Sequence, residues 1–240
     1  MELTLTKIPS NPDELVKAFL TEIRTDYVVN NPFFKSLKDK KYTVKQLQMA
    51  FAAFAHYRSL FSRFLGHMIL RLPIETEEWG PCGLNLAEEY GYGKPGKSHG
   101  ILYANFLRGI GLTVKPEFII AEELKEMPEC AKNFERAFVK FLASAPIPGI
   151  VGMSGAYELL DGPEAKAQRE ALQKYGFTKE LAYFTEHEIE KAHFTKYNED
   201  QLNKYWSNPK ARKDVVEGFN QVYRIQDRFY SELHEFAISF

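Results

Sequence analysis

Apolar residues recur at steps of three and four along most of the chain, which is the spacing of amphipathic α-helices. Thr43 and Gln46 form a capping-box pattern that opens the clearest helix, and Pro73 ends it. Only Arg58 interrupts its apolar stripe, which consists of Leu47, Phe51, Phe54, Phe61, Leu65, Met68 and Leu72. No stretch alternates with period two for long enough to predict a strand, so the pattern predicts an all-α bundle.

Start and stop residues predict the other helices. Asn11 followed by Pro12 is typical of a helix start, and glycines and prolines, Pro163 among them, divide the middle of the chain. The further helices are expected from Asn11 toward Arg24, over 77–90, from near Ser98 to Gly109, over 181–205 and over 215–240.

Length and composition narrow the class of protein. The 240 residues suffice for one substantial core, so we expect a single helical domain over 1–240. With 31 Lys plus Arg against 32 Asp plus Glu, the net charge of −1 gives no electrostatic reason to expect nucleic acid or an anionic membrane as partner. Cys82 and Cys130 make no CxxC pair, and no secretion signal or long apolar run is present, so a soluble, unexported, cytoplasmic protein is expected.

The segment 183–193 concentrates metal-ligand side chains, because two histidines and three glutamates fall within eleven residues. Carboxylate with imidazole is the ligand set of non-haem iron. In a regular helix Glu186, Glu190 and His193 share one stripe, whereas in a tighter or bulged helix His187, Glu190 and His193 converge instead. The sequence leaves both sets open, and a solvated charged helix face is the ordinary alternative.

Upstream residues supply further ligand candidates. Glu89 and His99 flank a Gly-rich turn, and Glu158 lies in a run of small and apolar residues where a buried charge needs a metal or another partner. A salt bridge to Arg or Lys is the alternative for Glu158. A helix cap or a satisfied core residue is the alternative for His99.

These motifs resemble a known family. The runs 85–93 (Asn-Leu-Ala-Glu-Glu-Tyr-Gly-Tyr-Gly), 106–112 and 183–187, with His99 and Tyr157-Glu158, are similar to the haem-oxygenase-like dimetal oxidases and oxygenases. The branch it resembles is named for the chlamydial protein associating with death domains. That branch belongs to a wider grouping with the thiaminase-II-like and pyrroloquinoline-quinone-synthase-like proteins. The resemblance covers about Pro32 to Tyr197.

The resemblance implies a bundle of about seven to eight helices, often a homodimer, which holds two iron ions. Carried over by position, the implied ligands include Glu89, His99 and Glu158. The family then has His-x-x-x-Asp-x-x-His, with six residues between the histidines, whereas five separate His187 from His193. Either Glu190 replaces the Asp and one residue is missing, or Glu186 has replaced the first His. A two-iron, a weakened and a single-metal site all stay open.

The expected function is therefore an O2-dependent oxidase or oxygenase that uses Fe(II), with two ions per chain implied, and acts on a small molecule. Arg58, alone in an apolar stripe, is the candidate clamp for a substrate carboxylate, unless it reaches the surface or pairs with Glu158. Tyr157 and Tyr183 are candidates to lie beside the metals. The alternatives are a metal-free enzyme of the same superfamily, or a non-catalytic ligand-binding or interaction protein.

Overall fold

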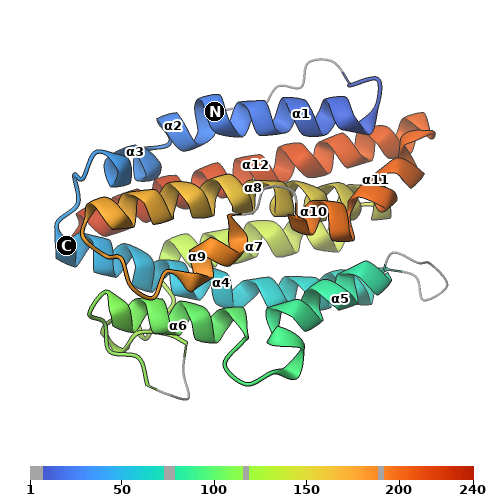
Figure 1. The fold of residues 1–240 in the computed structure, drawn as a ribbon. Helices are drawn as coiled ribbons and strands as arrows, with labels where there is room; N and C mark the ends of the chain where they lie inside the picture. Colours follow the sequence, from blue (N-terminus) through green and yellow to red (C-terminus); the bar gives the residue numbers. More distant parts are fainter. Residues whose placement is uncertain (1–7, 73–78, 116–118, 189–191) are drawn as a thin grey trace.

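The computed structural model describes residues 8–72, 79–115, 119–188 and 192–240, and shows an elongated bundle of helices (Figure 1). The α-helices are α1 (Pro12–Glu22), α2 (Val28–Asn30), α3 (Pro32–Lys38), α4 (Val44–Arg71), α5 (Trp79–Glu89), α6 (His99–Gly109), α7 (Glu129–Ser144), α8 (Ile147–Lys174), α9 (Ala182–His187), α10 (Ala192–Tyr197), α11 (Glu199–Trp206) and α12 (Pro209–Ile238). A π-helical turn, Ile23–Tyr27, joins α1 to α2. The described part of the chain contains no strand, and the predicted all-α bundle is confirmed.

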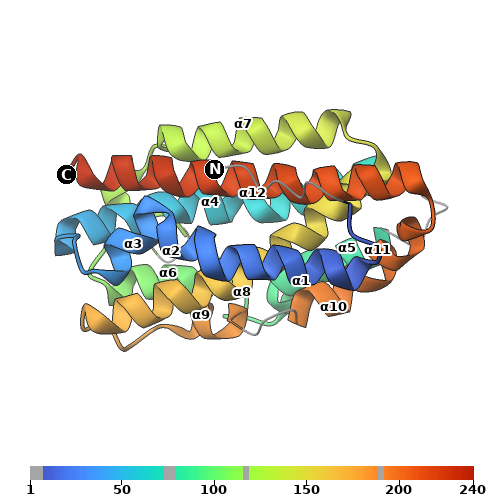
Figure 2. The ribbon, with the colours of Figure 1, turned by 90° about the horizontal axis from the view of Figure 1, so that it is seen from above.

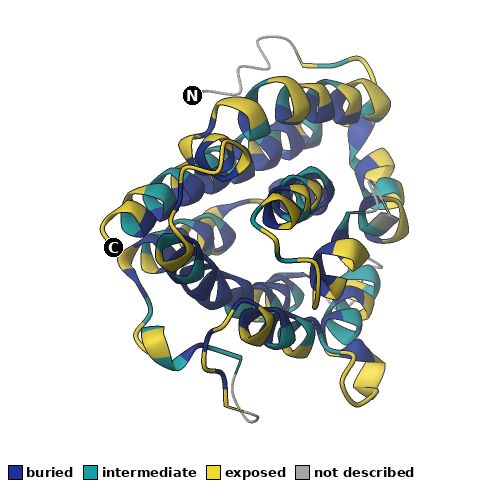
Figure 3. Ribbon diagram, turned by 60° about the vertical axis from the view of Figure 1, so that its left-hand side comes forward, coloured by how far each residue is buried: buried dark blue, intermediate teal, exposed yellow. Residues whose placement is uncertain are grey.

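The long helix α8 is the central element of the bundle. It packs against α12 along its length and also contacts α1, α3, α9, α10 and α11. On the other side of α12, α7 and α4 complete the bundle, and Figure 2 shows α7 running along the outer side of α12. Buried residues face the interior between these helices, and exposed residues face outward (Figure 3). Among the described residues, no helix combines the length and apolarity needed to cross a membrane.

The predicted helix starts at Asn11, Thr43 and Ser98 are confirmed, whereas the last helix, expected from residue 215, begins earlier, at Pro209. The Asn11 side chain accepts a hydrogen bond from Glu14 N at 2.9 Å, and Ser98 caps α6 in the same way through Ile101 N. At the start of α4, Thr43 and Gln46 form both hydrogen bonds of the capping box. Local hydrogen bonds of this kind satisfy the free N–H groups of a first helical turn, which explains why sequence alone located them.

Two other expected helix boundaries were wrong. Pro163 lies inside α8 rather than at a helix end, and the preceding Gly162 has no Cβ to clash with the proline ring in helical geometry. The single helix expected over 181–205 is instead α9, α10 and α11. Asn198, with a φ of −126°, separates α10 from α11, and α9 ends at His187.

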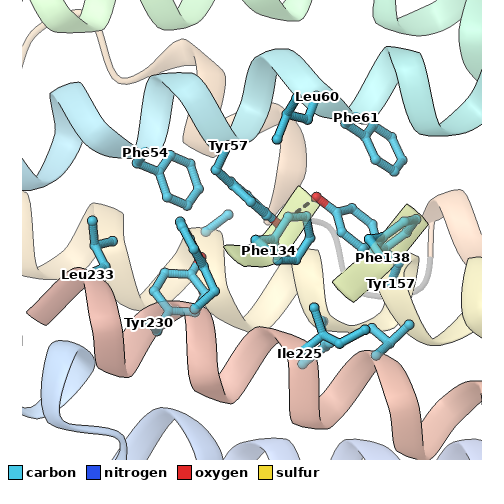
Figure 4. Packing of buried hydrophobic residues seen from close by; sticks show 14 of the residues in the cluster. Phe54, Tyr57, Leu60, Phe61, Phe134, Phe138, Tyr157, Ile225, Tyr230 and Leu233 are labelled. Carbon is cyan, nitrogen blue, oxygen red and sulfur yellow. Dashed lines mark hydrogen bonds between the residues drawn. The ribbon is translucent and has the colours of Figure 1, made fainter. Parts of the chain in front are cut away.

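Stacked aromatic rings lock α4 against α8 at the centre of the bundle (Figure 4). The ring of Phe61 stacks on Tyr157 with centroids 4.5 Å apart, and Tyr57 stacks on Phe229 of α12 at 4.4 Å. The hydroxyls of Tyr57 and Tyr157 meet at 2.5 Å. Such pairs are stable only in specific geometries, so this layer fixes which face of α4 is turned toward α8.

Glycine permits the close crossing of α8 and α12. A Cβ on Gly218 would overlap the carbonyl oxygen of Gly149 and lie 2.6 Å from Met153 N, and Gly152 meets the backbone of Val215 in the same way. The two backbones are therefore in direct contact, and a side chain at the crossing would force the helices apart.

We predict that Gly218→Ala lowers the free energy of unfolding by roughly 1–3 kcal/mol, because the added methyl overpacks a backbone contact. Gly66→Ala in α4 is the matched control, since a Cβ at this position would have no other atom within 4 Å. That control should raise the free energy of unfolding by about 0.5–1 kcal/mol through helix propensity. Urea unfolding followed by circular dichroism measures both, and equal effects would contradict the close-crossing argument.

Candidate metal centre

A tight turn between α5 and α6 brings Glu89 and His99 together. Gly91, Tyr92 and Gly93 have positive φ angles of 64°, 52° and 72°, which reverse the chain direction within three residues. A Cβ on Gly91 would lie 2.6 Å from the Lys97 carbonyl carbon, so this position requires glycine. Glu89 at the end of α5 consequently faces His99 at the start of α6, with Glu89 Oε1 and His99 Nδ1 2.8 Å apart.

His187 of α9 completes a buried group with these two residues. The ligand atoms of Glu89, His99 and His187 all lie within 4.8 Å of one another, and each residue is buried. His187 Nε2 lies 3.2 Å from His99 Nδ1. Of the residues that the structure describes, this trio is the group that fits a metal ion. One carboxylate and two imidazoles suit a divalent transition metal.

The protonation states of His187 and Glu89 favour metal binding. His187 Nδ1 lies 2.6 Å from the carbonyl oxygen of Tyr183 and donates its proton there, which leaves the Nε2 lone pair facing Glu89 and His99. Burial, together with the nearby Arg58 charge, holds the pKa of His187 well below its ordinary value. Burial raises the pKa of Glu89, but the His99 hydrogen bond and the Arg58 charge outweigh it and lower the value to about 2. A neutral imidazole and an ionised carboxylate are the forms that ligate metal.

Arg58 of α4 lies inside this polar cluster. Its guanidinium is 3.8 Å from Glu89 Oε1 through Nη2, and 3.8 Å from Asp161 Oδ1 through Nη1. The alternative in which Arg58 pairs with Glu158 is therefore wrong, because Arg58 pairs with two other carboxylates. Arg58 is only 8% exposed, so the alternative of a side chain that reaches the surface is also wrong.

Asp161 was not among the residues nominated from the sequence. It follows Glu158 by three positions on α8, so both carboxylates face the same side of the helix, and Asp161 Oδ2 lies 3.7 Å from His187 Nε2. Burial raises its pKa, although the Arg58 charge opposes that effect. The i, i+3 spacing of Glu158 and Asp161 is the sequence signal that could have identified this residue.

Glu158 and His193 form a second, adjacent pair. Glu158 is 5% exposed, accepts a 2.6 Å hydrogen bond from Asn85 Nδ2, and lies 3.3 Å from His193 Nδ1. Burial opposes the charged form of His193, but the hydrogen bond and charge of Glu158 raise its pKa to about 9. The rings of His187 and His193 are 6.1 Å apart at their centroids, so this pair borders the trio.

The structure separates the nominated residues of the 183–193 segment. His187 is buried in the cluster, whereas Glu186 is exposed on α9. Glu190 lies outside the described residues. Because α9 ends at His187, the regular-helix stripe of Glu186, Glu190 and His193 is not continuous. Of the described residues in this segment, His187 and His193 are the two nominated ligands that reach the carboxylates.

The nominated tyrosines border the cluster, Tyr183 through its ring and Tyr157 through its hydroxyl. The Tyr183 ring lies 4.3 Å from that of His187 and 5.2 Å from the Arg58 guanidinium carbon. The hydroxyl of Tyr157 lies 3.4 Å from Arg58 Nη1.

A pocket of about 160 Å³ opens beside the trio. Glu89 and His99 form part of its wall, so a ligand in the pocket would contact the same side chains that face the metal position. Its other walls combine the Arg58 guanidinium with hydroxyl groups and apolar surface, from Ser59, Ser62, Ser98, Tyr103, Ile119 and Tyr183. A small molecule with both polar and apolar parts fits these walls.

A separate buried carboxylate, Glu164, lies deeper in the bundle. It accepts hydrogen bonds from the hydroxyls of Tyr27 at 2.7 Å and Tyr230 at 2.8 Å. Burial raises the pKa of Glu164 to about 8, and the two phenols oppose that rise. A carboxylate stabilised by neutral donors stays protonated more readily than one beside a cation.

Comparison with known proteins places this geometry in a family. A model of iron-containing redox enzymes matches residues 48–227, a range that includes all the described members of the cluster. No curated protein is similar enough in sequence to match the chain.

Solved structures share the fold. A CADD-like protein of unknown function from Nostoc punctiforme superposes with a TM-score of 0.75 at 17% identity, covering 95% of this chain and 96% of that one. A domain of unknown function with a haem-oxygenase-like fold from Shewanella denitrificans gives 0.68 at 16% identity, covering 93% and 90%. The predicted haem-oxygenase-like fold and family resemblance are confirmed.

The raised pKa of Glu164 predicts a pH-dependent stability. Between its ordinary value near 4.5 and about 8, the folded state keeps a proton that the unfolded state has lost, so the free energy of unfolding falls as pH rises through this range. Glu164→Gln removes this titration. We expect the melting temperature of the unaltered protein, relative to Glu164→Gln, to decrease from about pH 5 to about pH 8. If the melting temperatures of the two proteins changed in parallel with pH, the raised pKa of Glu164 would be contradicted.

Proposed function

Because the chain belongs to the iron-containing redox enzyme family, we propose that it is a non-haem, Fe(II)-dependent oxidase or oxygenase that uses O2 to oxidise a small molecule. The observation that carries the proposal is the trio of Glu89, His99 and His187, whose ligand atoms lie together and whose burial excludes bulk water. In this proposal the three side chains hold iron. The bound iron would supply the redox chemistry with oxygen.

The residue types fit iron rather than a structural metal. A structural zinc site usually contains thiolates, but the burial of Cys82 and Cys130 raises both thiol pKa values to about 12. The same shift argues against the metal-free alternative that depends on a cysteine nucleophile, because a protonated thiol attacks poorly. Carboxylate and imidazole ligands with an adjacent pocket are typical of iron sites that admit a substrate.

The surrounding residues have distinct proposed roles. The carbonyl of Tyr183 orients His187 through the Nδ1 proton, and the Tyr183 ring closes one side of the cluster. The Arg58 guanidinium donates a hydrogen bond to the Tyr157 hydroxyl, which in turn lies 2.5 Å from the Tyr57 hydroxyl, so the proposed role of Tyr157 is to position Arg58 beside the cluster. Arg58 already faces two protein carboxylates, so the expected role as a clamp for a substrate carboxylate is not part of the proposal.

The substrate is proposed to enter the pocket beside the trio. Its volume of about 160 Å³ limits the part of the substrate that is enclosed to a small group, and Ser59 and Ser62 offer hydroxyls for a polar substituent. The homodimer expected from the family resemblance stays a prediction.

We predict that His99→Ala reduces Fe(II) affinity by roughly 100-fold or more, because loss of a ligand should cost at least as much as loss of a residue that supports one. Oxygen consumption that depends on added Fe(II) should fall with it. His67→Ala is the matched control, since His67 is exposed on α4. This variant should keep both the Fe(II) affinity and the oxygen consumption of the unaltered protein. Iron content after desalting and an oxygen electrode provide the two measurements.

An unaltered protein that takes up no Fe(II) and consumes no oxygen would reject the proposal. A ligand-binding or interaction protein on the same bundle would then be the better explanation.

A further inference from the structure

Two aromatic rings help to fix the position of Arg58. Its guanidinium carbon lies 5.5 Å from the centroid of Phe61 and 5.2 Å from that of Tyr183. Phe61 is itself stacked on Tyr157, so the stem and head of Arg58 are part of the packed core. A guanidinium held in this way is a permanent positive charge, because arginine does not lose its proton in proteins.

The two ends of the guanidinium face different helices. Nη2 lies on the side of the trio, 3.8 Å from Glu89 Oε1 and 3.4 Å from His187 Nε2. Nη1 faces Asp161 Oδ1 at 3.8 Å and the Tyr157 hydroxyl at 3.4 Å. The head of Arg58 therefore joins a carboxylate of α5 to a carboxylate of α8, which is the arrangement that a second cation next to the trio would have.

The charges of the cluster argue against a second iron. Glu158 is paired with His193, so Glu89 and Asp161 contribute two negative charges when ionised, whereas Arg58 with one Fe(II) already contributes three positive charges. Glu88, the next acid of the described cluster, is already paired with Lys196 at 3.0 Å. A second Fe(II) would raise the excess from one positive charge to three, and because these residues offer no further anion, that uncompensated charge in a buried site would be costly.

We propose that Arg58 takes the place of a second metal ion, so that the chain holds one iron at Glu89, His99 and His187 while the guanidinium neutralises Asp161. The inference depends on the proposed iron site and refines it. Asp161 is then a partner of Arg58 and not a ligand of the bound iron. The second Glu–His pair, Glu158 with His193, is balanced internally and needs no ion.

The test is the iron count per chain after anaerobic loading with Fe(II) and desalting, measured by mass spectrometry. We expect about one iron in the unaltered protein and in Arg58→Lys, which keeps the charge. Arg58→Met removes the charge at similar length and should raise the count toward about two, and adding Asp161→Asn to it should return the count to about one. Circular dichroism and melting temperature check that each variant is folded.

Asp161→Asn alone provides a test that does not need Arg58→Met to fold. It should leave the count at about one, because Asp161 binds no iron while Arg58 is present. About two irons in the unaltered protein would overturn this inference and leave the proposed function standing. A folded Arg58→Met variant that still binds about one iron per chain would also overturn this inference and leave the proposed function standing. No iron in the unaltered protein would overturn the proposed function, and the inference with it.

Discussion

The need to neutralise buried carboxylates is the constraint on which the centre of this structure depends. Glu89 and Glu158 lie in an interior made mostly of aromatic and aliphatic side chains, where an isolated negative charge is strongly disfavoured. The fold answers with nearby cations and donors, chiefly Arg58 and His193, while Asn85 donates to Glu158. The helices α4, α5, α8 and α10 each contribute either a charge or a partner for one.

Helix packing explains how these partners meet. The close crossing of α8 and α12 fixes the long axis of the bundle, and the aromatic layer turns α4 so that Arg58 faces inward. The glycine turn after α5 then places Glu89 beside His99. The cluster is thus assembled by segments far apart in sequence, each oriented by ordinary packing or turn chemistry.

Sequence patterns predicted what depends on local interactions. Helix caps at Asn11 and Thr43, the amphipathic stripe of α4 and the all-α class follow from hydrogen bonds and periodicity within a few residues. Residue type and spacing nominated Glu89, His99 and Glu158, the family resemblance selected the same positions, and the structure brings them to the same region. Sequence reasoning was weaker where contacts between distant segments determine which partner a side chain has. Nothing local shows that Arg58 would pair with Glu89 and Asp161, because these residues are brought together only by the packing of α4, α5 and α8.

Glu164 shows that burial alone does not make a metal ligand. It lies on the same helix as Glu158 and Asp161, yet its partners are the neutral phenols of Tyr27 and Tyr230. Burial raises the pKa of Glu164 to about 8. By contrast, the cations near Glu89 help to lower the pKa of Glu89 to about 2. Two buried carboxylates in one bundle thus differ in protonation because of the charges beside them. The side of the bundle where α4, α5, α6 and α9 meet is the part whose carboxylate is kept ionised and ready to bind a cation.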